Sequence, residues 1–217
     1  YIAKSLTLRG GYTTTNWTTS DPAANPTTLD AAQGGRVLFI TGPISVTVEN
    51  LRLTGGNADN GGGIYNIAAA TVISNTLVYS NSATDNGGGL YNESLGKVTL
   101  AASTVMSNTA DGGGGIYTTG DGSAVALRNG SRVQANTATF DGGGIYNIAQ
   151  SALTIDDSRV ISNTSGADGG GVTNWQSSVL TITNGSRIAD NLASRGGGVW
   201  NGDNSTAAID QSQLLSN

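Results

Sequence analysis

The hexapeptide GGGIYN occupies Gly61–Asn66, and five close copies of it follow along the chain. The copies are GGGLYN from Gly87, GGGIYT from Gly113, GGGIYN from Gly142, GGGVTN from Gly169 and GGGVWN from Gly196. The first glycines of consecutive copies are 26, 26, 29, 27 and 27 residues apart. Self-similarity at a period of about 20–50 residues is typical of stacked repeat architectures. The sequence therefore predicts a solenoid.

A second pattern runs in step with the first and reads Ser or Thr, any residue, an aliphatic residue, any two residues, Asn. Its copies are TLVYSN (76–81), STVMSN (103–108), SRVQAN (131–136), SRVISN (158–163), SRIADN (186–191) and SQLLSN (212–217). Variable apolar segments lie between the two patterns, such as ALTI at Ala152–Ile155 and VLTI at Val179–Ile182. Apolar and polar residues alternate in these segments, which is the periodicity of a β-strand. Gly, Asn, Ser and Thr are poor helix formers, so helices are not expected.

Three short strands separated by Asn, Asp and Gly turns describe one rung of a parallel β-helix. We therefore expect an all-β, single-stranded parallel β-helix of about eight rungs, each with three short strands in 26–29 residues. Residues 1–60 are expected to form irregular N-terminal rungs with a surface loop at 13–26, and residues 61–217 the regular GGG[ILV]-x-N rungs of the same domain. Both ends lie inside the pattern, so the chain is interpreted as a fragment of a longer one.

Composition excludes several classes of function. The net charge is −5 and no basic run exists, which argues against a nucleic-acid partner or an anionic membrane surface. The chain has no Cys and no His, so thiol nucleophiles, thiolate metal sites and the commonest general base are absent. No apolar run reaches the roughly 18 residues that a membrane helix requires, so membrane insertion is not expected.

The pairing of GGG-aliphatic with aliphatic-x-x-Asn, separated by an apolar strand, resembles the repeats of chlamydial polymorphic outer-membrane proteins, which carry GGA-aliphatic and Phe-x-x-Asn tetrapeptides. More broadly, the chain resembles the right-handed parallel β-helices of the pectin-lyase-like class found in bacterial surface proteins. The resemblance covers residues 61–217 well and residues 1–60 loosely. It implies a secreted bacterial protein, outside the cell or on its surface. Right-handedness is implied by this resemblance and by the crossover rule for parallel strands.

Stacked repeats turn each repeat position into a column. The column after the aliphatic residue holds aromatic side chains, which we expect to point outward. These side chains are a candidate ligand-binding set: Tyr65, Tyr91, Tyr117, Tyr146 and Trp200, with Thr173 between the last two. Outward rings could stack on sugar rings. The alternative, which we favour, is that the rings stack on each other and shield the flank of the sheet.

Carboxylates form a second column just before the glycine triplets. Its members, a speculative calcium set, are Asp59, Asp85, Asp111, Asp141 and Asp168, followed by Arg195. Ca²⁺ between the rungs would offset the repulsion of these carboxylates, since it prefers several oxygen ligands. Alternatively, each Asp accepts backbone N–H groups of the glycines after it in an Asx turn. The register slips by one residue between Asp111 and Asp141. Apart from possible calcium, no cofactor is expected.

Two further columns complete the pattern. The asparagines that end the second pattern are expected to hydrogen-bond along their column and to have no chemistry. Arg132, Arg159 and Arg187 form a short column that is a candidate anion contact. The interpretation favoured from sequence is a solvated column partnered by Asp156, Asp157 and Asp190.

The sequence favours a non-enzymatic extracellular or cell-surface β-helix, acting as a stalk, an adhesin or an assembly subunit. Its expected partners are other copies or further rungs end to end, and a cell-surface glycan is a further candidate. The alternative is a carbohydrate-active module that binds or cleaves a polysaccharide along one face. Glycoside hydrolysis needs two carboxylates across a groove. The only adjacent acidic pair, Asp156 and Asp157, should point to opposite faces, so no catalytic residue is assigned.

Overall fold

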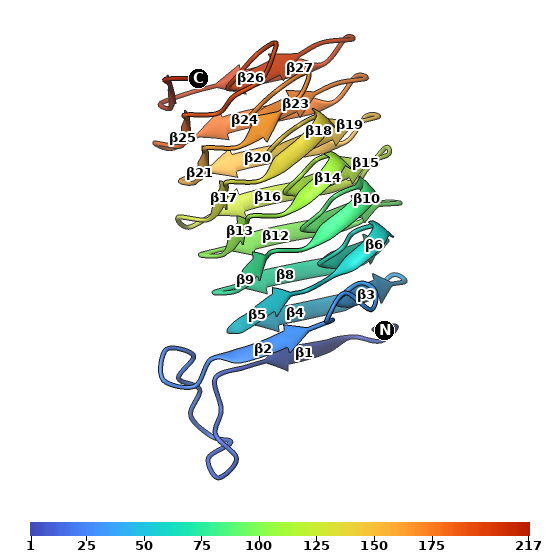
Figure 1. Ribbon diagram of the computed structural model, residues 1–217, viewed down its shortest axis with the longest axis vertical. Helices are drawn as coiled ribbons and strands as arrows, with labels where there is room; N and C mark the ends of the chain where they lie inside the picture. The colour runs from blue at the N-terminus through green and yellow to red at the C-terminus, as the bar shows by residue number, and fades with distance from the viewer.

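The computed structural model describes all 217 residues and forms a parallel β-solenoid, with the two termini at opposite ends of the stack (Figure 1). It contains 28 strands and no helix. The strands form four sheets in which each strand pairs in parallel with its equivalents one rung before and after. Two of the sheets have eight strands, so the chain makes seven complete turns between the first strand and the last (8 − 1 = 7).

The chain passes through the four sheets in a fixed order in each rung. The aromatic sheet, which contains the GGGIYN strands, consists of β3 (Leu38–Thr41), β7 (Ile64–Ile67), β11 (Leu90–Glu93), β15 (Ile116–Thr119), β19 (Ile145–Ile148), β23 (Val172–Asn174) and β26 (Val199–Asn201). The apolar sheet follows it and consists of β1 (Leu6–Arg9), β4 (Ser45–Glu49), β8 (Ala70–Ser74), β12 (Lys97–Ala101), β16 (Ala124–Arg128), β20 (Ala152–Asp156), β24 (Val179–Thr183) and β27 (Thr206–Ile209).

The remaining two sheets close the rung. The arginine sheet consists of β2 (Thr27–Asp30), β5 (Leu51–Thr54), β9 (Leu77–Tyr79), β13 (Thr104–Met106), β17 (Arg132–Gln134), β21 (Arg159–Ile161), β25 (Arg187–Ala189) and β28 (Gln213–Leu215). The short sheet consists of β6 (Asn57–Asn60), β10 (Ser82–Asn86), β14 (Thr109–Gly112), β18 (Thr137–Asp141) and β22 (Thr164–Ser165).

The short sheet corrects the expectation of three strands per rung. Each of its central strands buries a single small side chain, Ala83, Ala110 or Ala138, and the remaining residues are polar or glycine apart from the exposed Phe140 of β18. Backbone hydrogen bonds hold these strands together, and their register shifts at a bulge in each pair. Such a strand carries no apolar alternation that a sequence pattern could report.

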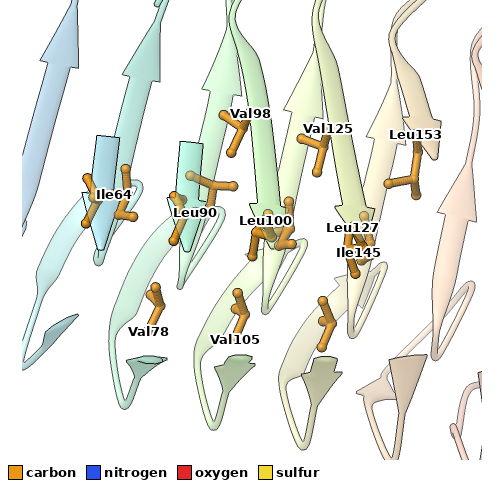
Figure 2. Packing of buried hydrophobic residues seen from close by; sticks show 14 of the residues in the cluster. Ile64, Val78, Leu90, Val98, Leu100, Val105, Val125, Leu127, Ile145 and Leu153 are labelled. Carbon is orange, nitrogen blue, oxygen red and sulfur yellow. The ribbon is translucent and has the colours of Figure 1, made fainter. Parts of the chain in front are cut away.

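The core is one cluster of 27 buried hydrophobic residues that runs along the inside of the stack. Figure 2 shows that equivalent side chains of successive rungs lie next to each other, as Val98, Val125 and Leu153 do in the apolar sheet. The aliphatic residue of every GGGIYN copy up to Val172 is completely or almost completely buried. The expected inward position of this residue is therefore confirmed.

The glycine triplet forms the corner between the short and aromatic sheets, where backbones of adjacent rungs approach closely. Gly87 has a φ of +68°, in the left-handed region that side chains disfavour. A Cβ atom on Gly88 would lie 2.3 Å from the carbonyl oxygen of Thr109 and 2.6 Å from that of Gly114. The triplet is therefore required by the spacing of the rungs and not merely tolerated.

Asparagine ladders lie at two of the other three corners, and buried Ser or Thr side chains such as Ser103 and Ser131 lie at the corner between the apolar and arginine sheets. In the outer ladder, each Nδ2 of Asn81, Asn108, Asn136 and Asn163 donates to the Oδ1 of the next asparagine at 2.9–3.1 Å. The same nitrogens also donate to a backbone carbonyl of the preceding rung. The prediction that these asparagines bond along their column is confirmed.

A second asparagine ladder comes from the last residue of the GGGIYN copies and was not anticipated. Asn66 donates to Asn92 at 2.8 Å, and Asn147 and Asn174 each donate to the next asparagine at 2.6 Å. Asn66, Asn92, Asn147 and Asn174 are all completely buried. Polar side chains thus line the interior wherever the rung turns, and apolar ones line its flat sides.

The chain from Gly10 to Pro26 joins β1 to β2 without any strand and extends away from the stack at its N-terminal end (Figure 1). Residues 38–60 form β3 to β6, and β3, β4 and β5 pair in register with β7, β8 and β9 of the next rung. The stack is therefore regular from β3 onward, and the loop is its one long insertion.

Candidate functional site

Four tyrosines of the aromatic sheet lie in one column, because Tyr65, Tyr91, Tyr117 and Tyr146 are register partners on adjacent strands. The ring centroids of Tyr65 and Tyr91 are 4.9 Å apart, those of Tyr91 and Tyr117 5.1 Å, and those of Tyr117 and Tyr146 5.3 Å. The Tyr91–Tyr117 pair is parallel, and the other two pairs meet edge to face. The rings therefore contact one another, as the favoured interpretation predicted.

Phe39 extends the column at its start, with its centroid 5.4 Å from that of Tyr65. The Arg36 guanidinium lies over both rings, 5.3 Å from the Phe39 centroid and 5.0 Å from the Tyr65 centroid. The Tyr65 hydroxyl donates a hydrogen bond to Glu93 at 2.6 Å. This end of the column is thus held by a cation–π contact and a charge-assisted hydrogen bond.

The column is less exposed than an outward position implies. Tyr65, Tyr91 and Tyr117 are partly buried, and Tyr146 is only 6% exposed. Gly112 of the short sheet has no side chain, and a Cβ atom there would lie 3.3 Å from Cδ1 of Tyr146. The rings lie outside the core cluster, as the expectation of an outward column predicted, but Tyr146 is covered and the other three rings are partly covered. A sugar could reach only parts of these rings.

Trp200 does not join the tyrosine column, because its register partner is Thr173, which is completely buried and separates it from Tyr146. Instead, Trp200 meets Trp175 edge to face at 5.8 Å, and the Arg195 guanidinium lies 5.9 Å from its ring centroid. The sequence set is therefore divided into a four-tyrosine column and a separate tryptophan pair.

The tyrosine column should make the fold sensitive to alkali. Burial and the hydrogen bond to Glu93 raise the pKa of Tyr65 to about 12, and burial likewise raises the pKa of Tyr91, Tyr117 and Tyr146. An unfolded tyrosine has a pKa near 10, so the unfolded chain releases its phenol protons first. We expect the tyrosine contribution to the free energy of unfolding to be constant below about pH 10 and to fall as the pH rises through 12, in urea titrations at successive pH values.

The matched variant for this alkaline effect replaces Tyr91 and Tyr146 by Phe, which keeps the ring contacts and removes two phenol groups. Its free energy of unfolding should fall less steeply above pH 10 than that of the native sequence. An equal slope in the two proteins would show that other groups cause the alkaline loss.

The predicted carboxylate column is not one column. The residues paired in register directly before the glycine triplets are Asn60, Asn86, Gly112 and Asp141, and further along Asp168 pairs with Arg195. Asp59, Asp85 and Asp111 lie one residue earlier, at the bulges of the short sheet. The one-residue slip that the sequence shows is therefore a real change of position, and it separates the predicted calcium set into two groups.

No three acidic side chains approach closely enough to hold a metal ion together. A Ca²⁺ ion between these rungs would have to draw most of its oxygen ligands from backbone carbonyls and water. The calcium hypothesis stays a prediction.

Asp168 and Arg195 form the best-defined ion pair of the chain. Nε and Nη2 of Arg195 donate to the two carboxylate oxygens at 2.6 and 2.7 Å, a bidentate geometry. Asp141 lies one rung away, where its Oδ1 accepts the backbone N–H of Asp168 at 3.2 Å, and burial raises the pKa of its carboxyl. Arg195 pairs with Asp168 and not with Asp141, and its bidentate bond to Asp168 is typical of a structural ion pair.

The insertion between β1 and β2 carries the most exposed tryptophan of the chain. The sequence predicted a surface loop here and no functional role for this residue. Trp17 is 73% exposed and stacks on Tyr12 with centroids 6.0 Å apart. Asn16 accepts hydrogen bonds from the backbone of Thr18 and Thr19, which fixes the loop around the ring. A groove of about 410 Å³ lies between the base of this loop and the arginine sheet, lined in part by Pro22, Pro26, Arg52 and Leu77.

Comparison of the chain with protein-family models, curated proteins and solved structures found no match. The assignment of the β-solenoid fold therefore rests on the structure alone, and the resemblance to surface-protein repeats stays a prediction. No helix of the structure is long and apolar enough to cross a membrane.

Proposed function

We propose that the protein is a non-enzymatic extracellular or cell-surface β-helix that serves as a rigid stalk, an adhesin segment or an assembly subunit. The observation that carries this proposal is the outer asparagine ladder, a hydrogen-bonded chain of buried side chains that crosses from rung to rung. Backbone hydrogen bonds, the packing of core side chains and the side-chain amides therefore all connect each rung to its neighbours. Such a structure resists bending and presents repeated columns along its sides.

Secretion by a bacterium is supported by the resemblance of the repeats to those of surface proteins. End-to-end partners follow from the physics of an open stack, since an edge strand offers unpaired N–H and C=O groups to any strand that can pair with it. Such partners would be further rungs of the same chain or other copies.

The proposal predicts that the protein is accessible on intact cells that make it. Protease added to unpermeabilised cells should remove the epitopes recognised by antibodies against the purified rod, while a cytoplasmic marker protein survives. Labelling that requires permeabilisation would contradict the proposed location. Release of sugar products from a polysaccharide by the purified chain would contradict the non-enzymatic role.

The alternative of a carbohydrate-binding module is favoured by one observation, the exposed Trp17 ring. The surrounding loop residues Thr13–Ser20 include threonine, asparagine and serine and no charged side chain. An aromatic face with uncharged hydroxyl groups beside it suits a neutral sugar. In this alternative the insertion, and not the tyrosine column, would hold the glycan.

A further inference from the structure

Three arginines lie side by side on the outer surface of the arginine sheet. Arg132 pairs in register with Arg159, and Arg159 pairs with Arg187, so the three occupy the same position on consecutive strands β17, β21 and β25. All three side chains are exposed. Adjacent strands are about 4.8 Å apart, so three positive charges are held within roughly 10 Å.

The acidic residues near this column do not neutralise it. Arg187 contacts Asp190 at 3.6 Å, but Asp156 contacts Arg128 at 3.3 Å and also accepts a hydrogen bond from Asn184. Arg132 and Arg159 form no ion pair. The sequence-based expectation of a fully partnered column is therefore wrong for two of the three arginines. Like charges directly opposite each other on neighbouring strands are destabilising, so the column carries a cost that an anion would remove.

A polar hollow of about 120 Å³ lies beside these guanidinium groups, lined by Gly130, Arg132, Asp157, Ser158, Arg159 and Gly185. Its cause is a difference in turn length. Three residues separate Arg128 from Arg132 and Thr183 from Arg187, but only two separate Asp156 from Arg159. The middle turn is shorter than the Asn-Gly turns on either side of it, so it lies recessed between them.

We propose that this hollow, with the Arg132–Arg159 pair, binds an acidic group of an anionic glycan, a carboxylate or a sulfate ester. The planar guanidinium matches such oxyanions with two parallel hydrogen bonds. Asp157 adds acceptors that suit sugar hydroxyls, whereas Ser158 is buried and donates its hydroxyl to the carbonyl of Asp156. No apolar side chain lines the hollow. A nucleic acid is disfavoured because no aromatic side chain lines the hollow, so no base could stack there.

The test measures binding of the purified chain to dextran sulfate, polygalacturonate, neutral dextran and single-stranded DNA by calorimetry at low, matched ionic strength. The native chain should bind one or both of the acidic glycans, and the choice between them identifies the acidic group. Arg132→Gln and Arg159→Gln should each weaken that binding about tenfold, since a hydrogen bond to a charged group contributes that much, and the double variant more.

Arg52→Gln is the matched control. Arg52 occupies the same outward position on β5 and its substitution removes the same charge, but its neighbour in the column is Leu77. It should leave affinity for the acidic glycan within about twofold. Equal affinities of the double variant and the native chain, equal losses in Arg52→Gln, absence of binding to either acidic glycan, or equally tight binding of neutral dextran or DNA would each overturn the proposal.

This inference rests on the adhesive part of the proposed function, and the two can fail separately. Loss of glycan binding in a double variant with native circular dichroism and melting temperature supports the site whatever the location of the protein. A cytoplasmic location found in the protease experiment would overturn the surface role without changing the result for the arginines.

Discussion

Gly88→Ala should lower the free energy of unfolding by about 3–5 kcal/mol, or prevent folding altogether, although it adds one methyl group. The added Cβ would meet two carbonyl oxygens at 2.3 and 2.6 Å, and both belong to backbone of the next rung. Backbone held by hydrogen bonds on both sides cannot move aside for one rung without disturbing its neighbours. Urea unfolding followed by circular dichroism measures the effect.

Gly130→Ala separates crowding from backbone strain in this comparison. Gly130 has a φ of +74°, but a Cβ atom there would meet no atom within 4 Å. Its loss should be about 1 kcal/mol, the ordinary cost of placing a side chain in a left-handed turn. Gly88 itself is not in the left-handed region, so a loss of only about 1 kcal/mol in Gly88→Ala would show that contact between rungs does not require the middle glycine of the triplet.

Asn136→Leu should be destabilising by about 4 kcal/mol, because the side chain of Asn136 serves three rungs at once. Its Nδ2 donates to the carbonyl of Val105 and to Oδ1 of Asn163, and its Oδ1 accepts the backbone N–H and the Nδ2 of Asn108. Leucine has a similar volume but fills none of these bonds, so the partners stay buried and unpaired. Thermal and urea unfolding both measure the loss.

Asn217→Leu is the matched control for this substitution. Asn217 occupies the same column but is exposed. Its Nδ2 donates to the carbonyl of Ile188, and its Oδ1 accepts the backbone N–H and the Nδ2 of Asn191, all in partly buried bonds. The loss there should stay near 1 kcal/mol, since water can replace the missing partners. A mild effect at Asn136 would mean that the ladder accompanies the stack without stabilising it.

The repeating part of this fold was predictable because stacking converts a sequence period into a spatial column. Ile64, Leu90 and Ile116 share one position in the pattern, and they lie in register in one sheet. The short sheet was not predictable in the same way, since its three central strands bury only one alanine each and are held by backbone bonds. Periodicity reports side-chain burial, and a strand without buried side chains of appreciable size leaves no such trace.

The candidate sites depended on details that a column alone does not contain. The tyrosines were correctly placed together, but their burial depends on Gly112, a residue of a different sheet. The pairing of the arginines depended on where Asp156 points, and it contacts Arg128 instead of Arg159. Trp17 lies in a loop that has no copy elsewhere in the chain, so the repeat pattern does not mark it as a candidate ligand-binding residue. Contacts between different columns therefore mark the limit of what the period can predict.

The two Asn-Gly turns, Asn129–Gly130 and Asn184–Gly185, make one level of the stack different from the others. In a perfectly periodic rod each rung offers the same surface, so a ligand would bind at equivalent positions with no preference. The turn between Asp156 and Arg159 has the same length as those between Glu49 and Arg52 and between Ala101 and Thr104, whereas the Asn-Gly turn on either side of it is one residue longer. These two longer turns flank a single rung, so a partner held between them would be bound at a fixed height along the axis.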